Sequence, residues 1–233
     1  MVVTRREFLG CAAGTVGSLG GWSVAIGPSP RWVVLLDLQE SCCLRESIAG
    51  YESALASMGV PWKLAEAGSP FPSRCPALIV PAAVDIPPAG SCAIVSCLQA
   101  GATVILESGA GFAEVAEFLA HRDLLRDSLQ VGVEAPVQLW PTRTRPHGIP
   151  YVDYTWPYAA KLRDFSRVVP LVRRGRASEI IGWVDGLPVA LRRRIGHGTL
   201  IFLGSPLGPA LWAGDAEARQ WLSAILSTRC GTC

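Results

Sequence analysis

The stretch Gly101-Ala102-Thr103-Val104-Ile105-Leu106-Glu107-Ser108-Gly109-Ala110-Gly111 decides the fold class. Gly101, before the apolar run of this stretch, is typical of a helix end, and Gly109 and Gly111, after that run, allow a tight turn. Residues 103–106 form a short β-branched and aliphatic run, which is typical of a strand buried on both faces of a parallel sheet. We therefore expect a core strand that ends at Glu107 and Ser108.

The same pattern recurs along the chain. Expected strands cover 32–38, 62–67, 77–81, 103–107 and 199–203, and expected helices cover 41–58, 88–99, 112–121 and 215–227. Alternating strands and helices predict an α/β fold with three layers: a mainly parallel central sheet with helices on both faces. The runs 33–37, 77–81, 103–107 and 199–203 should be parallel and central in it.

Two segments interrupt this alternation. The dipeptide Asp185-Gly186 lies between two apolar runs, 180–184 and 187–191, and predicts a β-hairpin. Residues 139–168 are rich in proline and aromatic residues and predict a long ordered loop. Long loops in compact domains often carry function.

The first thirty residues differ from the rest. Arg5-Arg6 is followed by Phe8-Leu9 and an uncharged, glycine-rich run to Ile26. This segment resembles a twin-arginine export signal, which implies the twin-arginine translocase as a partner and a final location in the periplasm or on the outer face of the cytoplasmic membrane. Ser23-Val24-Ala25 offers a cleavage site; without cleavage, residues 8–26 would remain as a membrane anchor of marginal length.

Three regions follow from this boundary. Residues 1–30 are the signal or anchor, residues 31–228 are one α/β domain, and residues 229–233 are a cysteine-containing tail. Half of the chain is apolar and 17% is charged, which excludes a disordered protein. About 200 residues suffice for one domain with a substantial core.

Charge is distributed unevenly along the domain. Residues 31–139 carry 6 basic and 12 acidic side chains, a balance of −6, whereas residues 140–195 carry 11 basic and 4 acidic ones, a balance of +7. The basic block either pairs with the acidic half of the same domain, which we favour, or faces an acidic partner or anionic lipids.

The tail contains Cys230-Gly-Thr-Cys233, the spacing of redox and metal sites. No second such motif is present in the sequence, so Cys230 and Cys233 are weak candidates for a metal site. A terminal disulfide or a pair of free thiols is the favoured interpretation. We expect no cofactor.

Three stretches resemble class I glutamine amidotransferase-like domains, which have a flavodoxin-like fold. They are Ala77 to Ala82, Gly101 to Gly111, and Gly196 to Pro206. In that family they correspond to a strand ending in an oxyanion loop, the strand with the nucleophile elbow, and a late strand carrying the catalytic His and Glu.

The catalytic residues of that family are not carried over. The elbow has Ser108 where an active amidotransferase has cysteine, and no His-x-Glu follows Leu203. His197 precedes the late strand, so we expect it at the opposite edge of the sheet from the site. The resemblance therefore implies a domain without glutaminase activity.

Candidate ligand-binding residues lie at the carboxyl ends of the expected strands, where sites of parallel sheets gather. They are Asp37, Glu107, Ser108, Gly109 and Gly111. The two carboxylates could bind a small polar ligand or accept hydrogen bonds from loop amides. Ser108 is either a weak candidate nucleophile or a turn residue.

The expected loop supplies a second candidate surface. Its basic and aromatic residues, Arg143, Arg145, Tyr151, Tyr154 and Trp156, are types enriched in protein interfaces. The alternative is a loop folded over its own core, and nucleic acid is not an expected partner. The sequence thus favours an exported, non-catalytic module that binds a polar ligand or envelope protein. The alternative is a serine hydrolase using Ser108, Glu107 and a base that the sequence does not identify.

Overall fold

The computed structural model describes residues 32–38, 42–69, 75–109, 112, 114–139, 151–163, 167–172 and 178–228. The expected signal and the cysteine tail lie outside these residues. Within them, no helix is both long enough and apolar enough to cross a membrane.

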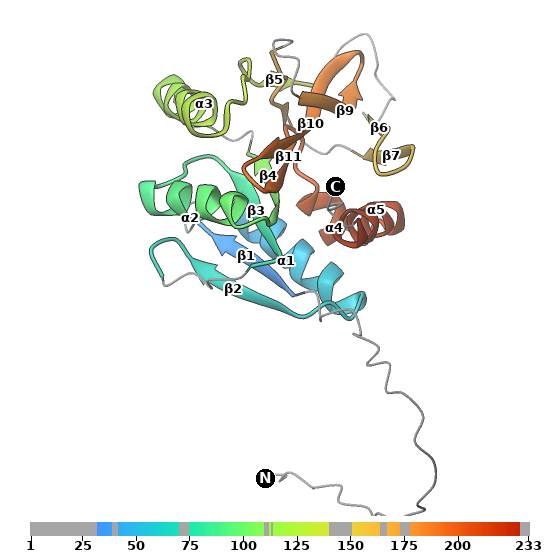
Figure 1. Ribbon diagram of the computed structural model, residues 1–233. Helices are drawn as coiled ribbons and strands as arrows, with labels where there is room; N and C mark the ends of the chain where they lie inside the picture. Colours follow the sequence, from blue (N-terminus) through green and yellow to red (C-terminus); the bar gives the residue numbers. More distant parts are fainter. Residues whose placement is uncertain are drawn as a thin grey trace, which may run out of the picture.

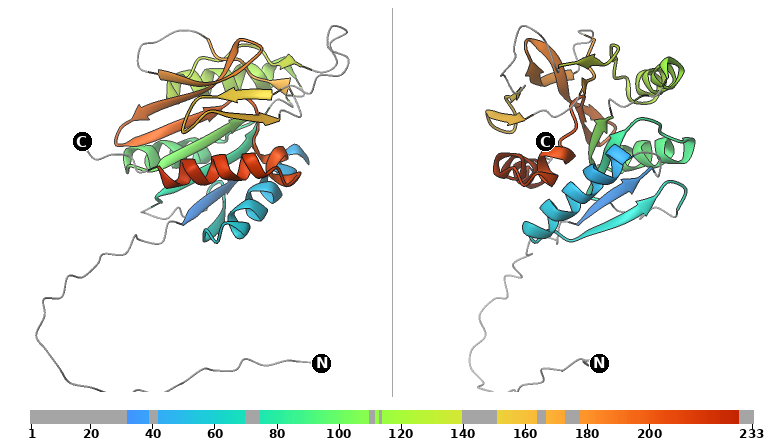
Figure 2. Two further views of the ribbon diagram at one scale, coloured as in Figure 1. Left: turned by 90° about the vertical axis from the view of Figure 1, so that its right-hand side faces the viewer. Right: turned by 180° about the vertical axis from the view of Figure 1, so that it is seen from behind.

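Among the described residues, nine strands form one sheet in the order β2-β1-β3-β4-β11-β10-β9-β6-β7 (Figures 1 and 2). Their bounds are β1 Val33–Asp37, β2 Trp62–Glu66, β3 Ala77–Ala83, β4 Thr103–Ser108, β6 Tyr151–Tyr154, β7 Ala160–Arg163, β9 Ser178–Val184, β10 Leu187–Ile195 and β11 Gly198–Leu203. A small separate pair joins β5 (Val137–Gln138) to β8 (Arg167–Val168).

The α/β fold expected from the sequence is confirmed. Strands β1, β3, β4 and β11 are parallel neighbours in the middle of the sheet, and β2 extends them in parallel at one edge. Among the five parallel strands this is the flavodoxin-like order 2-1-3-4-5. The other half, from β10 to β7, is antiparallel, so the sheet is mixed rather than parallel throughout.

Helices cover both faces of the sheet, as Figure 2 shows. On one face lie α1 (Cys42–Ser57), α4 (Gly208–Trp212) and α5 (Ala216–Ser227), which share a core with odd-numbered residues of β4 such as Ile105. On the other face lie α2 (Pro88–Gln99) and α3 (Val115–Leu129), which share a core with Val104 and Leu106. Alternation along β4 therefore separates two hydrophobic cores.

Helix α3 corrects one expectation. It continues eight residues past His121, and its buried face is Phe118, His121, Leu125 and Leu129, a helical spacing. Val115 and Leu119, two apolar residues of the same helix, are 76% and 39% exposed. The predicted helix end at His121 was wrong because the charged segment after His121 forms the outer face of the same helix.

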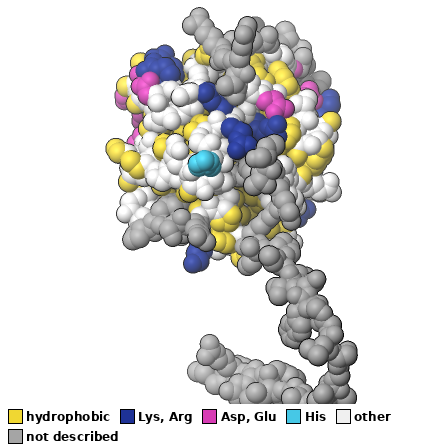
Figure 3. Space-filling view, viewed as in Figure 1, with side chains coloured by type: hydrophobic (Ala, Val, Ile, Leu, Met, Phe, Trp, Pro, Cys, Tyr) yellow, Lys and Arg dark blue, Asp and Glu magenta, His cyan; other side chains and the backbone are white. Residues whose placement is uncertain are grey.

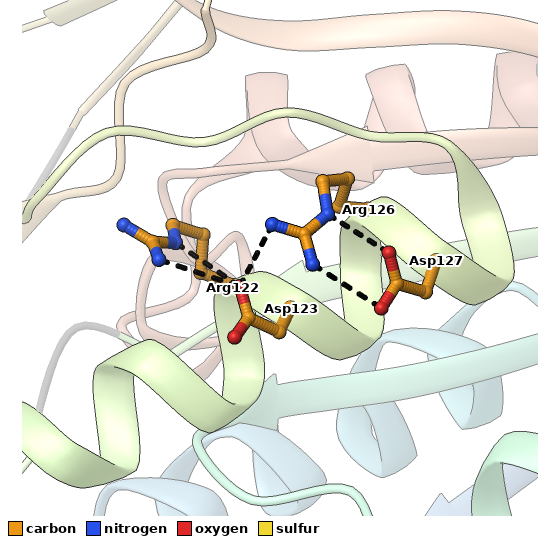
Figure 4. Close-up of polar contacts among 4 residues, drawn as sticks. All are labelled: Arg122, Asp123, Arg126 and Asp127. Atoms are coloured by element: carbon orange, nitrogen blue, oxygen red, sulfur yellow. Dashed lines mark hydrogen bonds and ion pairs between the residues drawn. The ribbon is translucent and has the colours of Figure 1, made fainter.

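That outer face carries a row of alternating charges (Figure 4). Asp123 contacts Arg122 at 3.3 Å and Arg126 at 3.1 Å, and Arg126 contacts Asp127 at 2.8 Å. These side chains are 40–66% exposed, and exposed pairs of this kind contribute little stability.

The expectation of a loop over 139–168 was also wrong in part, because the strands β6, β7 and β8 lie within it. Residues of β6 alternate exposed and buried, with Val152 and Tyr154 inward, which is the strand period. Pro150 and Pro157 flank β6 rather than interrupt it. The proline content of this segment predicted a loop, whereas the alternation of exposed and buried residues in β6 is that of a strand.

Candidate functional site at the end of β4

Strand β4 ends in two buried polar residues that face opposite sides of the sheet. Glu107 and Ser108 are both 0% exposed. Glu107 shares its face with Ile105, toward α1 and α4, and Ser108 shares the other with Leu106, toward α2 and α3. The end of β4 thus holds two separate buried polar sites, one on each face of the sheet.

The Glu107 carboxylate is bonded by donors from three other parts of the chain. The donors are the N–H groups of Ala82 (3.1 Å), Leu207 (2.7 Å) and Gly208 (3.1 Å), and the hydroxyls of Ser47 (3.4 Å) and Tyr51. They come from α1, the end of β3 and the start of α4. The carboxylate therefore joins three segments of the fold, as the loop-amide interpretation of Glu107 expects.

The backbone around Ala82 is shaped for this contact. Ala82 has φ +39, an unfavourable value for a residue with a Cβ, at a register irregularity between Val80 and Ala83. This turn directs the Ala82 N–H to the Glu107 carboxylate. At Gly109, an added Cβ would lie 2.6 Å from the Ala82 carbonyl oxygen, so close packing requires a glycine there.

Electrostatics at Glu107 reflect two opposing effects. Burial raises the pKa of the carboxyl group above its ordinary value, while the bonds from Tyr51 and the three amides lower that pKa. Burial and the nearby carboxylate also raise the pKa of Tyr51 well above its ordinary value. The phenol consequently stays protonated and serves as a donor.

On the opposite face, Ser108 meets a histidine that sequence reasoning did not select. Its Oγ lies 2.9 Å from Nε2 of His121 on α3, which is 3% exposed. Burial lowers the pKa of His121 to about 4, so the imidazole is neutral near pH 7. Among the described residues, Nδ1 of His121 has no hydrogen-bond partner, and the Phe112 ring packs 5.2 Å from the imidazole.

A neutral imidazole beside a hydroxyl is the minimal arrangement for activating a serine. Two features oppose that use: Ser108 is 0% exposed, and the described residues place no group on Nδ1 to orient the ring. A helix predicted to continue through Leu129 would have placed His121 on its buried face, so the missed helix end concealed this residue.

The other candidate ligand residues share the same edge of the sheet but not one cluster. Asp37 is half-buried at the carboxyl end of β1, which β3 separates from β4. Its backbone carbonyl accepts from Ala67 N–H at 3.2 Å. Gly111 lies outside the described residues, and ligand binding by this set stays a prediction.

The candidate partner residues fall into three environments. Tyr151 is 40% exposed on the outer strand pair, whereas Tyr154 is 3% exposed and packs 4.2 Å from the Trp221 ring. Trp156 is half-buried; Arg192 lies 4.7 Å over its ring, and its carbonyl accepts from Trp221 Nε1. Arg143 and Arg145 lie outside the described residues, and the burial of Tyr154 does not support a contact role for it.

Figure 3 shows several Lys and Arg side chains close together near the middle of the face seen in Figure 1. In residues 140–195, two described ion pairs join basic to acidic side chains: Lys161 with Asp153 at 3.2 Å and Arg192 with Glu179 at 2.6 Å. Arg193 donates to the Gln130 carbonyl at 3.0 Å. The two ion pairs are exposed and lie within the basic half, so they are not the predicted pairing with the acidic half, whereas the Arg193 bond reaches Gln130 at the end of α3.

A cavity lies at the amino edge of the sheet, and its lining is mostly apolar. It has a volume of about 270 Å³ between the starts of β1, β3 and β4 and the end of α5, with Trp32, Gly101 and Thr228 in its lining. Its described lining residues carry no ionisable side chain. His197 is exposed at this edge, with its Cβ 3.8 Å from an ideal Cβ at Gly101, so it lies far from Ser108 as expected.

Metal binding receives no support from the described residues, which contain no group of three His, Cys, Asp or Glu side chains suited to hold an ion. Cys230 and Cys233 lie outside them, so that candidate stays untested.

Sequence comparisons give no family for this chain: no family model matches it, and no curated protein matches it. Solved structures are similar to it in fold. One is a putative ThuA-like protein from Bacteroides uniformis, with TM-score 0.56 and 10% identity over 88% of this chain and 94% of that one. Another is a cytoplasmic protein from Salmonella typhimurium LT2, with TM-score 0.58 and 12% identity over 84% and 98%.

Larger enzymes contain the same fold. An exo-β-1,4-mannosidase from Opitutaceae bacterium strain TAV5 has TM-score 0.61 at 12% identity, over 88% of this chain and 37% of that one. A β-galactosidase from Bacillus circulans sp. alkalophilus has TM-score 0.57 at 13% identity, over 83% and 31%. This chain thus spans about a third of those enzymes. At such identities the likeness shows the fold alone: an α/β domain with a flavodoxin-like order of its parallel strands.

Proposed function

We propose that this chain is an exported, non-catalytic amidotransferase-like module that binds an envelope protein or a small polar ligand. The observation that carries the proposal is the burial of Glu107 and Ser108, which lie where the sequence resembles the nucleophile elbow of amidotransferases. Glu107 is fully enclosed by donors of its own chain, and Ser108 beside it is fully buried. A residue that reacts with substrate has to be reached by it, whereas Ser108 is enclosed and Glu107 holds three segments of the fold together.

The resemblance of the first thirty residues to a twin-arginine signal supports the exported location. Replacing Arg5 and Arg6 with lysine in the full chain should retain the protein in the cytoplasm, because that route recognises the arginine pair. A matched Arg31→Lys variant should still be exported. Normal export of the double variant would refute this part of the proposal.

The binding part can be tested on the outer strand pair. Tyr151, Lys161 and Arg163 are exposed there, and aromatic and arginine side chains are frequent interface anchors. Full-length protein should capture a defined protein from solubilised envelopes, and Tyr151→Ala with Arg163→Ala should abolish that capture. Trp212→Ala, an equally drastic change at a 61% exposed aromatic on α4, is the matched control. Equal capture by the wild type, the double variant and Trp212→Ala would exclude the β6–β7 strand pair as the binding surface.

A serine hydrolase is the second candidate, and the 2.9 Å contact between Ser108 Oγ and His121 Nε2 favours it. A fluorophosphonate probe distinguishes the two functions, because it labels serines that a base activates. We expect no labelling of the folded protein and no ammonia release from glutamine above the uncatalysed rate. Labelling at Ser108 that is lost in His121→Gln would establish the hydrolase and overturn the proposed module.

A further inference from the structure

Basic side chains gather at the amino edge of the sheet. Strand pairing aligns one residue of each strand from β2 to β10 in a first row at this edge: Trp62, Val33, Ala77, Thr103, Thr199 and Arg194. Among the described residues, the first three rows of the strands from β2 to β9 contain four basic side chains and one acidic side chain: Lys63, Arg192, Arg193, Arg194 and Glu179.

The carboxyl end of these strands has the opposite charge. Asp37 and Glu66 end β1 and β2, and Asp185 lies in the turn between β9 and β10. Within the described strands from β2 to β9, no Lys or Arg lies at that end. Charges of the sheet are therefore separated along the strand axis, with the basic side chains at the amino edge.

Two of these basic side chains are already bonded within the chain. Arg192 contacts Glu179 at 2.6 Å, and Arg193 donates to a carbonyl at the end of α3. Lys63 and Arg194 are exposed, and no described acidic side chain pairs with either of them. Five strand-to-strand steps of about 4.8 Å separate β2 from β10, so these two residues lie about 24 Å apart. Such a spacing suits an extended anionic surface better than a small anion.

An aromatic residue and both ends of the described domain lie at the same edge. Trp32, just before β1, is half-buried, and Lys63 Nζ lies 5.8 Å from the centroid of its ring. Trp32 and Thr228, which follows α5, line the same cavity. In the sequence, the residues next to these two are Arg31 and Arg229, so the chain continues from this edge through a basic residue in both directions. Tryptophan together with lysine or arginine is typical of membrane–water interfaces.

The chain before the domain is short enough to keep this edge near a bilayer. Residues 27–31 join the uncharged run 8–26 to Trp32. Five extended residues span at most about 18 Å. If the run 8–26 stays in a membrane, the amino edge is therefore the part of the domain that lies against the bilayer surface.

We propose that the amino edge of the sheet, through Lys63, Trp32 and Arg194, docks on the anionic phospholipid head groups of a membrane. The membrane that the protein meets rests on the exported location proposed above, whereas the affinity for lipid rests on the edge itself. The acidic carboxyl edge then faces away from the bilayer. The exposed Tyr151 and Arg163 lie toward that edge, so the β6–β7 strand pair stays accessible to an envelope protein.

Sedimentation with vesicles tests the proposal on purified full-length protein. Vesicles of phosphatidylcholine alone measure binding through the uncharged run, and vesicles of equal parts phosphatidylcholine and phosphatidylglycerol add the anionic surface. Each Lys or Arg close to an anionic surface contributes about fivefold in affinity. The wild type should therefore bind the mixed vesicles about 25-fold more tightly or better at low salt, and high salt should remove this difference.

Two double variants of equal charge locate the surface. Lys63→Gln with Arg194→Gln should weaken binding to the mixed vesicles about 25-fold and leave binding to phosphatidylcholine unchanged. Arg45→Gln with Arg219→Gln removes the same charge near the starts of α1 and α5, toward the carboxyl edge, and should bind as the wild type does.

Two results would overturn the proposal: equal binding of the wild type to both kinds of vesicle, or an equal loss in the two double variants. Vesicle binding is measured on purified protein, so it is independent of export and of envelope capture. Failed export with intact vesicle binding would refute the proposed location alone, and normal export without lipid preference would refute this surface alone.

Discussion

Glu107 and Ser108 are consecutive in the sequence and equally buried, yet the two faces of the sheet treat them differently. Glu107 has several donors of its own chain around it, from α1, β3 and the start of α4. Among the described residues, Ser108 has one side-chain partner, His121, and a long bond to the Gly109 carbonyl at 3.5 Å, and Nδ1 of that imidazole has no partner. Burial alone therefore does not identify a structural role; the number of satisfied polar atoms distinguishes the two sites.

The largest effect should come from removing the carboxylate. Glu107→Ala leaves five buried donors without their acceptor, and the free energy of unfolding should fall by at least about 4 kcal/mol. Urea denaturation of the full chain measures it. Glu46→Ala, at an exposed position of α1, should change stability by less than about 0.5 kcal/mol. A similar small loss for both variants would mean that the Glu107 network is not structural.

The pH dependence of stability should separate the two faces. His121 has its pKa lowered to about 4, so stability linked to it is present above pH 6.5 and is lost as the pH falls toward 4. The loss should amount to about 3 kcal/mol, from a shift of roughly two and a half units. His121→Gln should remove this part of the slope in denaturation curves taken from pH 7 to 4.

Glu107 should act with the opposite sign. The pKa of Glu107 is raised, so its contribution to stability is present below its ordinary value of 4.5 and is lost as the pH rises through the folded-state pKa.

The comparison with His121→Gln also tests the state of His121. Wild-type stability that does not differ from that of His121→Gln at any pH would contradict the assignment of a neutral buried His121.

A smaller effect is expected for Tyr51→Phe, which removes one donor to Glu107 and keeps the buried ring. The free energy of unfolding should fall by about 1–2 kcal/mol at pH 7. The loss should be smaller at pH 5, because the Tyr51 bond favours the ionised carboxylate. Tyr158→Phe, at a 37% exposed ring, is the control and should be nearly neutral at both pH values. An equal loss at both pH values would show that the phenol does not bond the ionised form.

The smallest effect belongs to the outer face of α3, where charges are paired but exposed (Figure 4). Arg126→Ala removes its contacts to Asp123 and Asp127 and should cost less than about 0.5 kcal/mol, with the difference vanishing in high salt. A loss above 1 kcal/mol that persists in salt would mean that α3 depends on this row as much as on its buried face.

Sequence reasoning predicted the parallel half of the fold well because that half is built from continuous apolar runs. Residues 33–37, 77–83, 103–108 and 198–203 are strands in the expected parallel arrangement. Runs buried on both faces leave a signal that needs no knowledge of their neighbours. Their order in the sheet then follows from short, right-handed connections.

The antiparallel half of the sheet and the contacts of the candidate site were harder to predict from the sequence. Strand β6 is four residues long between prolines, and its pairing with β7 depends on a turn whose conformation proline and aromatic content did not reveal. His121 meets Ser108 because α3 packs back over β4, which is a tertiary relation that local periodicity does not specify. Glu107 was selected as a site residue, but its donors at residues 207 and 208 lie about a hundred positions away.

Placing β11 beside β4 also fixes when the domain can be finished during synthesis. The centre of the sheet waits for residues 198–203, and the Glu107 carboxylate waits for the amides of Leu207 and Gly208. Until the ribosome has released them, β4 presents an unpaired apolar edge, the kind of surface that chaperones bind. The centre of the sheet therefore forms only after residues 198–208 have left the ribosome, and a translocase that accepts folded chains would have to act after α4 and α5 have docked.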